Sequence, residues 1–254
     1  MFLQHTLRSA VAATAAFLLA TPAANAQPLP TAAEIVAKHV AAVGGKDAIA
    51  KITSVKQTGA MEITAAGMTA DLEMVIVAPN KQSMKISLPG LGEMLQGTDG
   101  NVVWSVNPMQ GARLLEGKEA AQMKEQADFA ANMLFAAEKF SSMTNEGIVD
   151  FAGEKAYKIK MVRKDTNTES WNYFSVASGL QIGSEATLQS EMGTMTTSTT
   201  IADYKQFGPI KMATRSEMMT GPQKMVLTIK NAEFNTLGAD GVSVPAAVQP
   251  LIKK

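Results

Sequence analysis

The sequence predicts a mainly β fold in which one antiparallel sheet curls around helices. From residue 55 onward, apolar and polar residues alternate with a period of two in one segment after another, which is typical of strands with one buried face. Turns rich in glycine, asparagine and proline separate these segments at regular intervals. Only one alanine-rich stretch in the middle of the chain interrupts them, so hairpins are expected rather than βαβ units.

Residues 1–26 have the pattern of a cleaved secretory signal peptide. Arg8 lies in a polar beginning, an apolar run extends from Ala10 to Ala20, and the small residues Ala24-Asn25-Ala26 form a cleavage site. The apolar run is shorter than the roughly 20 residues that cross a bilayer. We therefore expect a periplasmic protein that begins at Gln27 and is not inserted in a membrane, with an uncleaved anchor as the alternative.

Charge and cysteine content narrow the possible functions. The chain has 23 basic residues, 23 acidic residues and no cysteine. Balanced charge argues against nucleic acid or an anionic membrane as the primary partner, because both require clustered positive charge. The absence of cysteine excludes disulfides, thiol catalysis and thiolate metal ligands, as well as the acylated cysteine of a lipoprotein.

The search for catalytic machinery is negative. His39 is the only histidine after residue 26. A single histidine argues against a metal site with several histidine ligands and against a Ser–His relay. His39 is interpreted as an ordinary residue of a helix face. No phosphate-binding glycine loop and no nucleophile elbow is present. We expect no metal site, no cofactor and no catalytic residues.

Two helical regions are expected. Thr31 and Glu34 form a capping box at the start of the first helix, Gly44-Gly45 ends it, and a short turn of helix follows over 46–52. The stretch 116–140 has no glycine or proline after Gly117, which predicts one helix of about six turns. Its second half is apolar around much of its circumference and must be covered by another element.

About a dozen strands are expected in a single sheet. Their approximate positions are 55–63, 68–76, 84–88, around 94, 102–106, 147–151, 156–162, 170–176, 180–188, 194–204, 210–218 and 225–234. A sheet of this width cannot stay flat, so its right-handed twist should curl it into an open or closed barrel. The helices are then available to fill the concavity.

Methionine is the residue type that points to a binding surface. The chain has 17 methionines, several of them at alternating positions expected to face inward. Methionine is unbranched and polarizable, so it adapts to apolar ligands of more than one shape. The alternative is an ordinary core in which methionine replaces leucine. The residues expected to line a ligand cavity on the concave face are Met61, Met74, Met84, Met212 and Leu227.

The aromatic residues Trp171, Tyr173 and Phe174 have two possible uses. Cross-strand packing is favoured over ligand stacking, because adjacent strands commonly use aromatic residues in this way. Trp104, after the Asp99-Gly100 turn, either lies at the rim of a cavity or closes the core.

Several motifs in chain order resemble the LolA/LolB-like outer-membrane lipoprotein-sorting superfamily over about residues 31–235. These motifs are Gly44-Gly45-Lys46, Asp99-Gly100 with Trp104, Asn107-Pro108-Met109, a helix beginning near Glu119, Asp203-Tyr204-Lys205, and Gly208-Pro209-Ile210-Lys211-Met212. The resemblance implies one domain over residues 27–254. In this domain an antiparallel half-barrel of about eleven strands has its concave face covered by the N-terminal helix and the long helix.

The same resemblance implies a soluble, non-enzymatic periplasmic carrier or binder of lipid or lipoprotein acyl chains, or of another hydrophobic ligand. Two alternatives stay open at this point. One is a periplasmic interaction or sensor module whose concavity is filled by its own helix, and the other is an unrecognised hydrolase. A cavity of several hundred Å³ favours the binder, whereas a polar triad or paired carboxylates inside it would favour the hydrolase.

Overall fold

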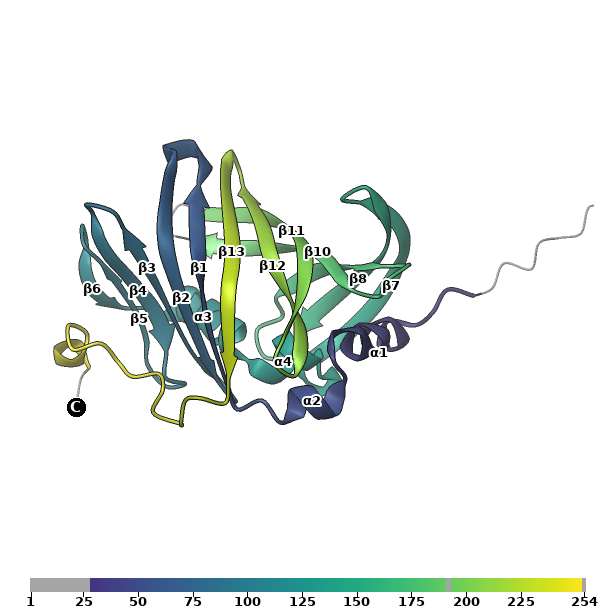
Figure 1. The fold of residues 1–254 in the computed structure, drawn as a ribbon, viewed down its shortest axis with the longest axis horizontal. Coiled ribbons are helices and arrows are strands. Elements are labelled where there is room, and N and C mark those ends of the chain that lie inside the picture. Colours follow the sequence, from purple (N-terminus) through teal and green to yellow (C-terminus); the bar gives the residue numbers. More distant parts are fainter. Residues whose placement is uncertain (1–27, 191–192, 253–254) are drawn as a thin grey trace, which may run out of the picture.

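The computed structural model describes residues 28–190 and 193–252 of the chain, and its strands form a single antiparallel sheet (Figure 1). The sheet has 13 strands, which confirms the predicted mainly β fold. The predicted signal peptide lies outside the described residues, so its cleavage stays a prediction. Among the described helices, none has both the length and the apolar character required to span a membrane.

The sheet consists of two meanders that meet in its middle. The first comprises β1 (Ser54–Ile63), β2 (Met68–Val77), β3 (Lys81–Leu88), β4 (Gly92–Thr98), β5 (Val103–Asn107) and β6 (Gly111–Leu114). The second comprises β7 (Phe140–Phe151), β8 (Glu154–Arg163), β9 (Glu169–Ser175), β10 (Gln181–Ser190), β11 (Gly193–Phe207), β12 (Ile210–Thr220) and β13 (Gln223–Phe234). Because β1 pairs with β13, strands β6 and β7 are the two edges of an open sheet.

The first helices form as the sequence predicts. In α1 (Ala32–Val43), the Thr31 hydroxyl accepts the Glu34 N–H while the Glu34 carboxylate accepts the Thr31 N–H, which completes the capping box. Gly44 ends the helix with φ 140°. A Cβ at this position would lie 2.9 Å from the Pro209 carbonyl oxygen, so only glycine fits where α1 approaches the β11–β12 turn. The short helix α2 (Lys46–Ala50) follows.

The single long helix predicted over 116–140 is wrong, because the chain breaks at Asp128. Helix α3 (Gly117–Ala127) ends there, and α4 (Phe129–Leu134) begins with Asp128 as its N-cap residue. The Asp128 carboxylate accepts the Ala131 N–H at 3.1 Å, an alternative to helical pairing that aspartate offers more readily than alanine or glutamate. A short 3-10 turn (Ala137–Lys139) then leads into β7.

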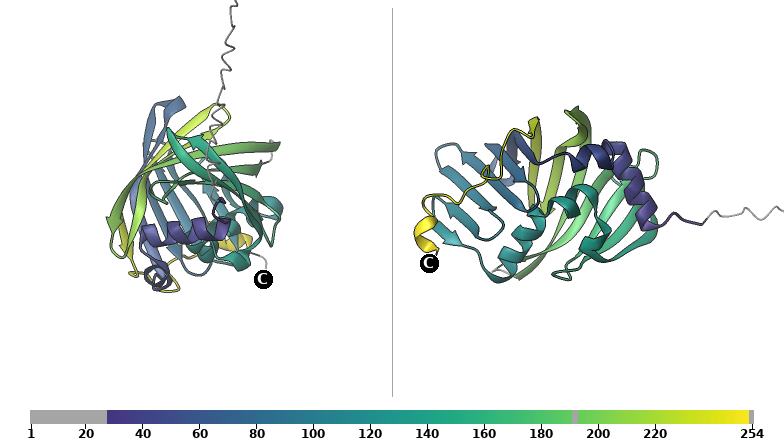
Figure 2. Two further views of the ribbon diagram at one scale, coloured as in Figure 1. Left: turned by 90° about the vertical axis from the view of Figure 1, so that its right-hand side faces the viewer. Right: turned by 90° about the horizontal axis from the view of Figure 1, so that it is seen from below.

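This broken helical segment crosses the concave side of the sheet from one edge to the other. Its first part, α3, contacts β3, β4 and β5 in the first meander and β10 in the second. Figure 2 shows the sheet curling around the helices, which lie inside the curve. The arrangement confirms the half-barrel expected from the sequence, with helices on its concave face.

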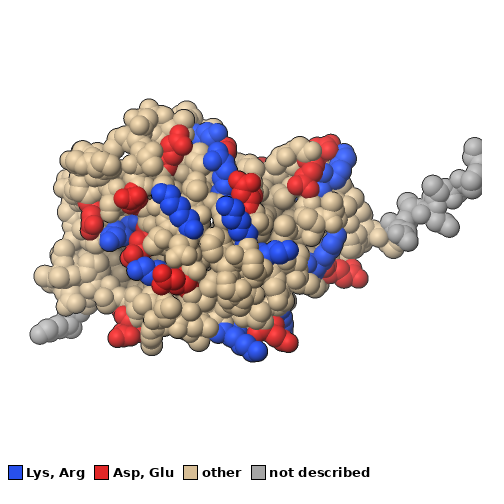
Figure 3. Space-filling model, in the orientation of Figure 1, with Lys and Arg blue, Asp and Glu red and all other residues tan. Residues whose placement is uncertain are grey.

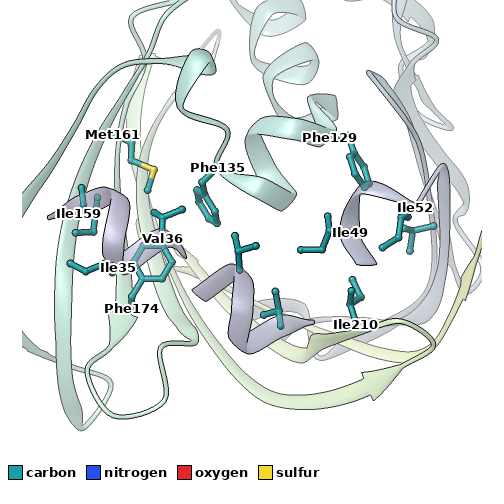
Figure 4. Packing of buried hydrophobic residues seen from close by; sticks show 14 residues of the cluster. Ile35, Val36, Ile49, Ile52, Phe129, Phe135, Ile159, Met161, Phe174 and Ile210 are labelled. Carbon is teal, nitrogen blue, oxygen red and sulfur yellow. The ribbon is translucent and has the colours of Figure 1, made fainter. Parts of the chain in front are cut away.

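The main hydrophobic core lies between the helices and the concave face at one end of the sheet (Figure 4). Ile35 of α1 and Ile49 of α2 point toward Phe174 and Ile210 of the strands, and all four side chains are at most 2 % exposed. Such burial of aliphatic and aromatic side chains provides most of the stabilisation of a domain. At this end, therefore, the concavity is filled by the protein's own helices.

A second core lies on the outer face of the first meander, beneath a C-terminal segment (residues 235–252) that the sequence reasoning did not assign. Val242 and Val248 of this segment pack against Val75, Val77 and Trp104. The Lys81 ammonium also donates to the Ala239 carbonyl at 2.6 Å. Trp104 is 1 % exposed, so it closes this outer core and does not lie at the rim of a cavity.

Replacing Val248 by aspartate is expected to detach the C-terminal segment. Val248 is fully buried, and an unpaired carboxylate in its place would strongly oppose packing on Trp104. In a Trp171→Phe background, the fluorescence of Trp104 should shift to longer wavelength and become accessible to quenching by acrylamide. The matched control is Ala247→Asp, at an exposed neighbouring position, which should leave the spectrum unchanged. An unshifted Trp104 spectrum in Val248→Asp would show that the segment does not hold this core closed.

Candidate functional site

All five residues predicted to line a cavity lie on the concave face of the sheet. Met74 is opposite Met84 in the β2–β3 ladder, and Met61 is opposite Leu227 in the β1–β13 ladder. These residues share their face with Val55, which packs in the main core beside Ile49 of α2. The fifth predicted residue, Met212, lies nearer that core.

The fifth residue, Met212, is separated from the others by Gln57. Its sulfur lies 3.9 Å from the Gln57 Nε2, and its side chain packs at the margin of the main core. Met74 lies on the other side of Gln57, directly opposite it in the β1–β2 ladder. The structure therefore places the predicted residues in one surface.

The central part of this surface is a cluster that we call the methionine face. Its members are Met61, Leu72, Met84, Ile86, Met225, Leu227 and Ile229. Met61, Leu72 and Ile229 are buried, whereas the other four are only partly buried. Since the main core buries its central side chains completely, this part of the concave face is covered less fully than the end filled by helices.

Four members of the methionine face were not among the five residues predicted to line a cavity: Leu72, Ile86, Met225 and Ile229. The period-two pattern does place Leu72 on the face of Met74 and Ile86 on the face of Met84, and it places Met225 facing inward. Ile229 continues the alternation of Met225 and Leu227 along β13, because the register shift lies beyond it, between the Thr58–Asn231 and Gly59–Ile229 pairs. Ile229 lies opposite Gly59, on the same face as Met61.

Two adjoining hollows lie beside α3. The outer hollow, of about 740 Å³, lies between α3, the β8–β9 turn and β10, and is lined by Gly117, Lys118, Ala121, Gln122, Glu125, Gln126, Thr166, Asn167, Thr168, Glu169, Trp171, Ala186 and Thr187. The inner hollow, of about 170 Å³, reaches Phe135, Phe140 and Met161. The two share Glu125, Gln126, Thr168 and Ala186. None of the five predicted lining residues borders either of these two hollows.

Side-chain bonds fix the end of α3 to the β8–β9 turn. The Glu125 carboxylate accepts hydrogen bonds from the hydroxyls of Thr166 and Thr168, the latter at 2.9 Å. Next along the chain, the Asp128 carboxylate lies 3.2 Å from Arg163 and 2.9 Å from Lys139. The outer hollow is therefore bounded by a helix held at its C-terminal end.

The ion pairs also determine the charge state of Asp128. Burial alone would raise the pKa of this carboxyl group, but the hydrogen bonds from Lys139 and the Ala131 N–H, with the charges of Lys139 and Arg163, outweigh burial. The pKa of Asp128 therefore lies below its ordinary value. Asp128 is ionised at neutral pH and serves as a structural anchor for Arg163.

His39 is buried in the main core beside the aromatic rings of Phe135 and Phe174. Its Nδ1 accepts the Gln181 N–H at 3.1 Å, from which we assign the ring proton to Nε2. Burial lowers the pKa of His39 to about 4, and the neighbouring Gly179 carbonyl opposes this effect only in part. The neutral imidazole thus connects α1 to the start of β10.

Charged groups are interspersed on the outer face of the sheet. Figure 3 shows acidic and basic side chains alternating across this face. One of the pairs is Lys56–Glu73, at 3.0 Å. Within the described residues, no group of three or more histidine, aspartate or glutamate side chains is arranged to hold a metal ion.

Comparison with known proteins finds similarity only among solved structures. No family model and no curated protein matches the chain. An outer membrane lipoprotein-sorting protein domain from Vibrio parahaemolyticus, described as putative, matches with TM-score 0.54 and 16 % identity, over 80 % of this chain and 92 % of that one. A LolA superfamily protein from Nitrosomonas europaea matches with TM-score 0.57 and 12 % identity, over 84 % and 97 %.

A DUF1329 family protein from Desulfovibrio piger is similar to the same degree. Its TM-score is 0.58 and its identity 12 %, over 84 % of this chain and 95 % of that one. At these identities the likeness concerns the fold.

Proposed function

Because this chain has the fold of LolA-superfamily proteins, we propose that it is a non-enzymatic periplasmic carrier or binder of a hydrophobic ligand, such as the acyl chain of a lipid or lipoprotein. The fold agrees with the resemblance seen in the sequence motifs. The ligand chain would lie against the methionine face.

The observation that carries this proposal is the partial exposure of apolar side chains on the inside of a curled sheet. Met84, Ile86, Met225 and Leu227 lie on the concave side but are only partly buried. A ligand covering them would remove apolar surface from water at about 0.8 kcal/mol per buried methylene. A chain of about 16 carbons would gain roughly 13 kcal/mol, which leaves micromolar affinity after association costs of 4 kcal/mol or more.

Two titratable groups at the helix-filled end of the concavity are already engaged in the fold, which supports a binder over an enzyme. His39 is held in its neutral form by the backbone of β10, and Asp128 is occupied by Arg163 and Lys139. Both have structural partners, and neither borders the methionine face. A periplasmic interaction or sensor module is the second candidate, supported by the helices that fill one end of the concavity.

Met84→Asp is expected to weaken the binding of a long-chain fatty acid at least tenfold. Met84 is a partly buried member of the methionine face, on β3, and a carboxylate there would be desolvated by the bound chain. The measurement is titration of the mature protein with a fluorescent fatty acid, with circular dichroism to verify folding. The control is Met109→Asp, since Met109 is 91 % exposed on the β5–β6 turn.

Native mass spectrometry of protein purified from the periplasm without detergent completes the test. The proposal expects co-purified lipid and saturable binding. If no lipid co-purifies and no saturable binding occurs at tens of micromolar fatty acid, the carrier proposal is wrong and the interaction module is the better account.

A further inference from the structure

Two methionine sulfurs on the concave face lie against buried amides. The Gln82 Nε2 lies 4.0 Å from the Met74 sulfur, and the Gln57 Nε2 lies 3.9 Å from the Met212 sulfur. Gln82 and Gln57 are only 8 % and 5 % exposed. Within the described part of the chain, a thioether sulfur is the only acceptor that either amide nitrogen contacts. Because sulfur is a weak acceptor, both buried amides retain capacity to donate a stronger hydrogen bond.

The strand registers place both pairs on the inner side of the sheet. Met74 is opposite Gln57 in the β1–β2 ladder, and Gln82 is opposite Ile76, two residues along β2 on the same face. Met212 packs at the margin of the main core, which lies on this side. Met74 and Met212 are both partly exposed, so a small solute can reach these side chains.

The separation between sulfur and nitrogen suits a methionine sulfoxide. The oxygen of a sulfoxide lies about 1.5 Å from the sulfur, and a hydrogen bond places the donor nitrogen about 2.9 Å from that oxygen. With an angle of about 120° at the oxygen, the sulfur and the nitrogen are about 3.9 Å apart. The separations at Met212 and Met74 are 3.9 and 4.0 Å. Oxidation of either sulfur would therefore add a strong acceptor within reach of a buried amide.

The oxidant that this chemistry requires is a peroxide. The chain has no cysteine, so methionine provides all of its sulfur. Hydrogen peroxide converts a thioether to a sulfoxide in one two-electron step. The sulfur gives an electron pair to one peroxide oxygen, the O–O bond breaks, and the second oxygen leaves as water with both protons. The transferred oxygen gains negative charge during this step, so an amide N–H beside the sulfur stabilises it.

We propose that Met74 and Met212 are sites of oxidation by a peroxide, at which Gln82 and Gln57 hold the sulfoxide oxygen. A sulfoxide is polar, so its formation lowers the affinity of the concave face for an apolar chain. This effect on binding rests on the proposed function, whereas the two oxidation sites do not.

Two other methionines of the concave face are internal references. Met84 is opposite Met74 and only partly buried, but no amide nitrogen of a described residue contacts its sulfur. The Met161 sulfur lies 3.4 Å from the Asn172 Nδ2, but Met161 is 1 % exposed in the main core (Figure 4). Each reference thus has one of the two properties, access or an amide contact, that Met74 and Met212 combine.

Peptide mass mapping after timed exposure to hydrogen peroxide measures oxidation at each methionine. In the folded parent protein, Met74 and Met212 should form the sulfoxide about fivefold faster than Met84, because each has one additional hydrogen-bond donor. Met161 should stay reduced. Oxidation of Met74 and Met212 at the rate of Met84 or more slowly overturns the proposal.

Two variants test the role of the amides. Gln82→Leu should slow oxidation about fivefold at Met74 alone, and Gln57→Leu should do so at Met212 alone, so each variant is the control for the other. Oxidation of Met84 should be unchanged in both, and circular dichroism verifies folding. Unchanged rates at Met74 and Met212 in the folded variants would show that the glutamines do not hold the sulfoxides.

Titration with a fluorescent fatty acid tests the effect on binding. The peroxide treatment is stopped before Met84 reacts, and the treated parent protein should then bind about tenfold more weakly than the untreated protein. A Met74→Leu/Met212→Leu double variant should keep its affinity after the same treatment. Unchanged affinity of the treated parent, or equal losses in both proteins, overturns the effect on binding. If the untreated parent binds no fatty acid, the proposed function fails, and mass mapping alone decides on the oxidation sites.

Discussion

Asp128→Ala is expected to lower the free energy of unfolding by about 3–5 kcal/mol, since it removes one partner of a buried ion pair and an N-cap at once. The side chains of Arg163 and Asp128 are only 9 % and 14 % exposed. Without Asp128, the Arg163 guanidinium keeps the weaker contact to Asp165, at 3.4 Å, and its position over the Phe140 ring, 5.7 Å from the ring centroid. Urea denaturation at pH 7 measures the loss.

Two variants make this experiment specific. Asp150→Ala breaks the Lys155–Asp150 pair, whose side chains are 64 % and 77 % exposed, and should change stability by about 1 kcal/mol or less. Adding Arg163→Met to Asp128→Ala should recover part of the loss, because the double variant leaves no unpaired buried charge. Equal effects of Asp128→Ala and Asp150→Ala would refute the anchoring role of Asp128.

The second large effect is a loss of stability at acidic pH, caused by His39. The folded protein holds the pKa of His39 at about 4, whereas an unfolded histidine titrates near 6.5. Below pH 6.5 the His39 side chain is protonated in the unfolded state but stays neutral in the folded state. The free energy of unfolding therefore falls as the pH decreases toward 4. The loss attributable to His39 should reach about 2 kcal/mol at pH 5 and about 3 kcal/mol at pH 4.

His39→Asn tests this effect. Asparagine places an amide oxygen near the position of Nδ1, where it can still accept the Gln181 N–H, and it does not titrate. The free energy of unfolding should depend less steeply on pH in the variant than in the parent protein between pH 7 and 5. Parallel pH profiles would mean that His39 is not the group responsible.

Most of the fold could be predicted from the sequence because period two and turn residues are local signals. The capping box at Thr31, the glycine end of α1 and the Asp99-Gly100 turn all formed as expected. Strand β6 was missed, since four residues are too few to show a period. The break at Asp128 was missed because its cause, a carboxylate shared by Ala131, Lys139 and Arg163, depends partly on a strand 35 residues away.

The candidate site was predictable only in part, for a related reason. The methionine face follows from alternation along strands that are neighbours in sequence, so its residues could be named in advance. The two hollows depend on α3 lying beside the β8–β9 turn, where Glu125 meets Thr168 across 43 residues. No local pattern in the sequence encodes that approach.

The pairing of β1 with β13 affects the order in which the sheet folds during synthesis. Every other strand pair joins neighbours in the chain, and such local hairpins form quickly, but the central pair must wait until the last strand is available. Until then β1 presents a bare edge whose apolar inner side includes Val55 and Met61. A chain cut short before Gln223 would keep that edge open permanently, and we expect it to aggregate through strand-to-strand association rather than persist as a smaller folded unit.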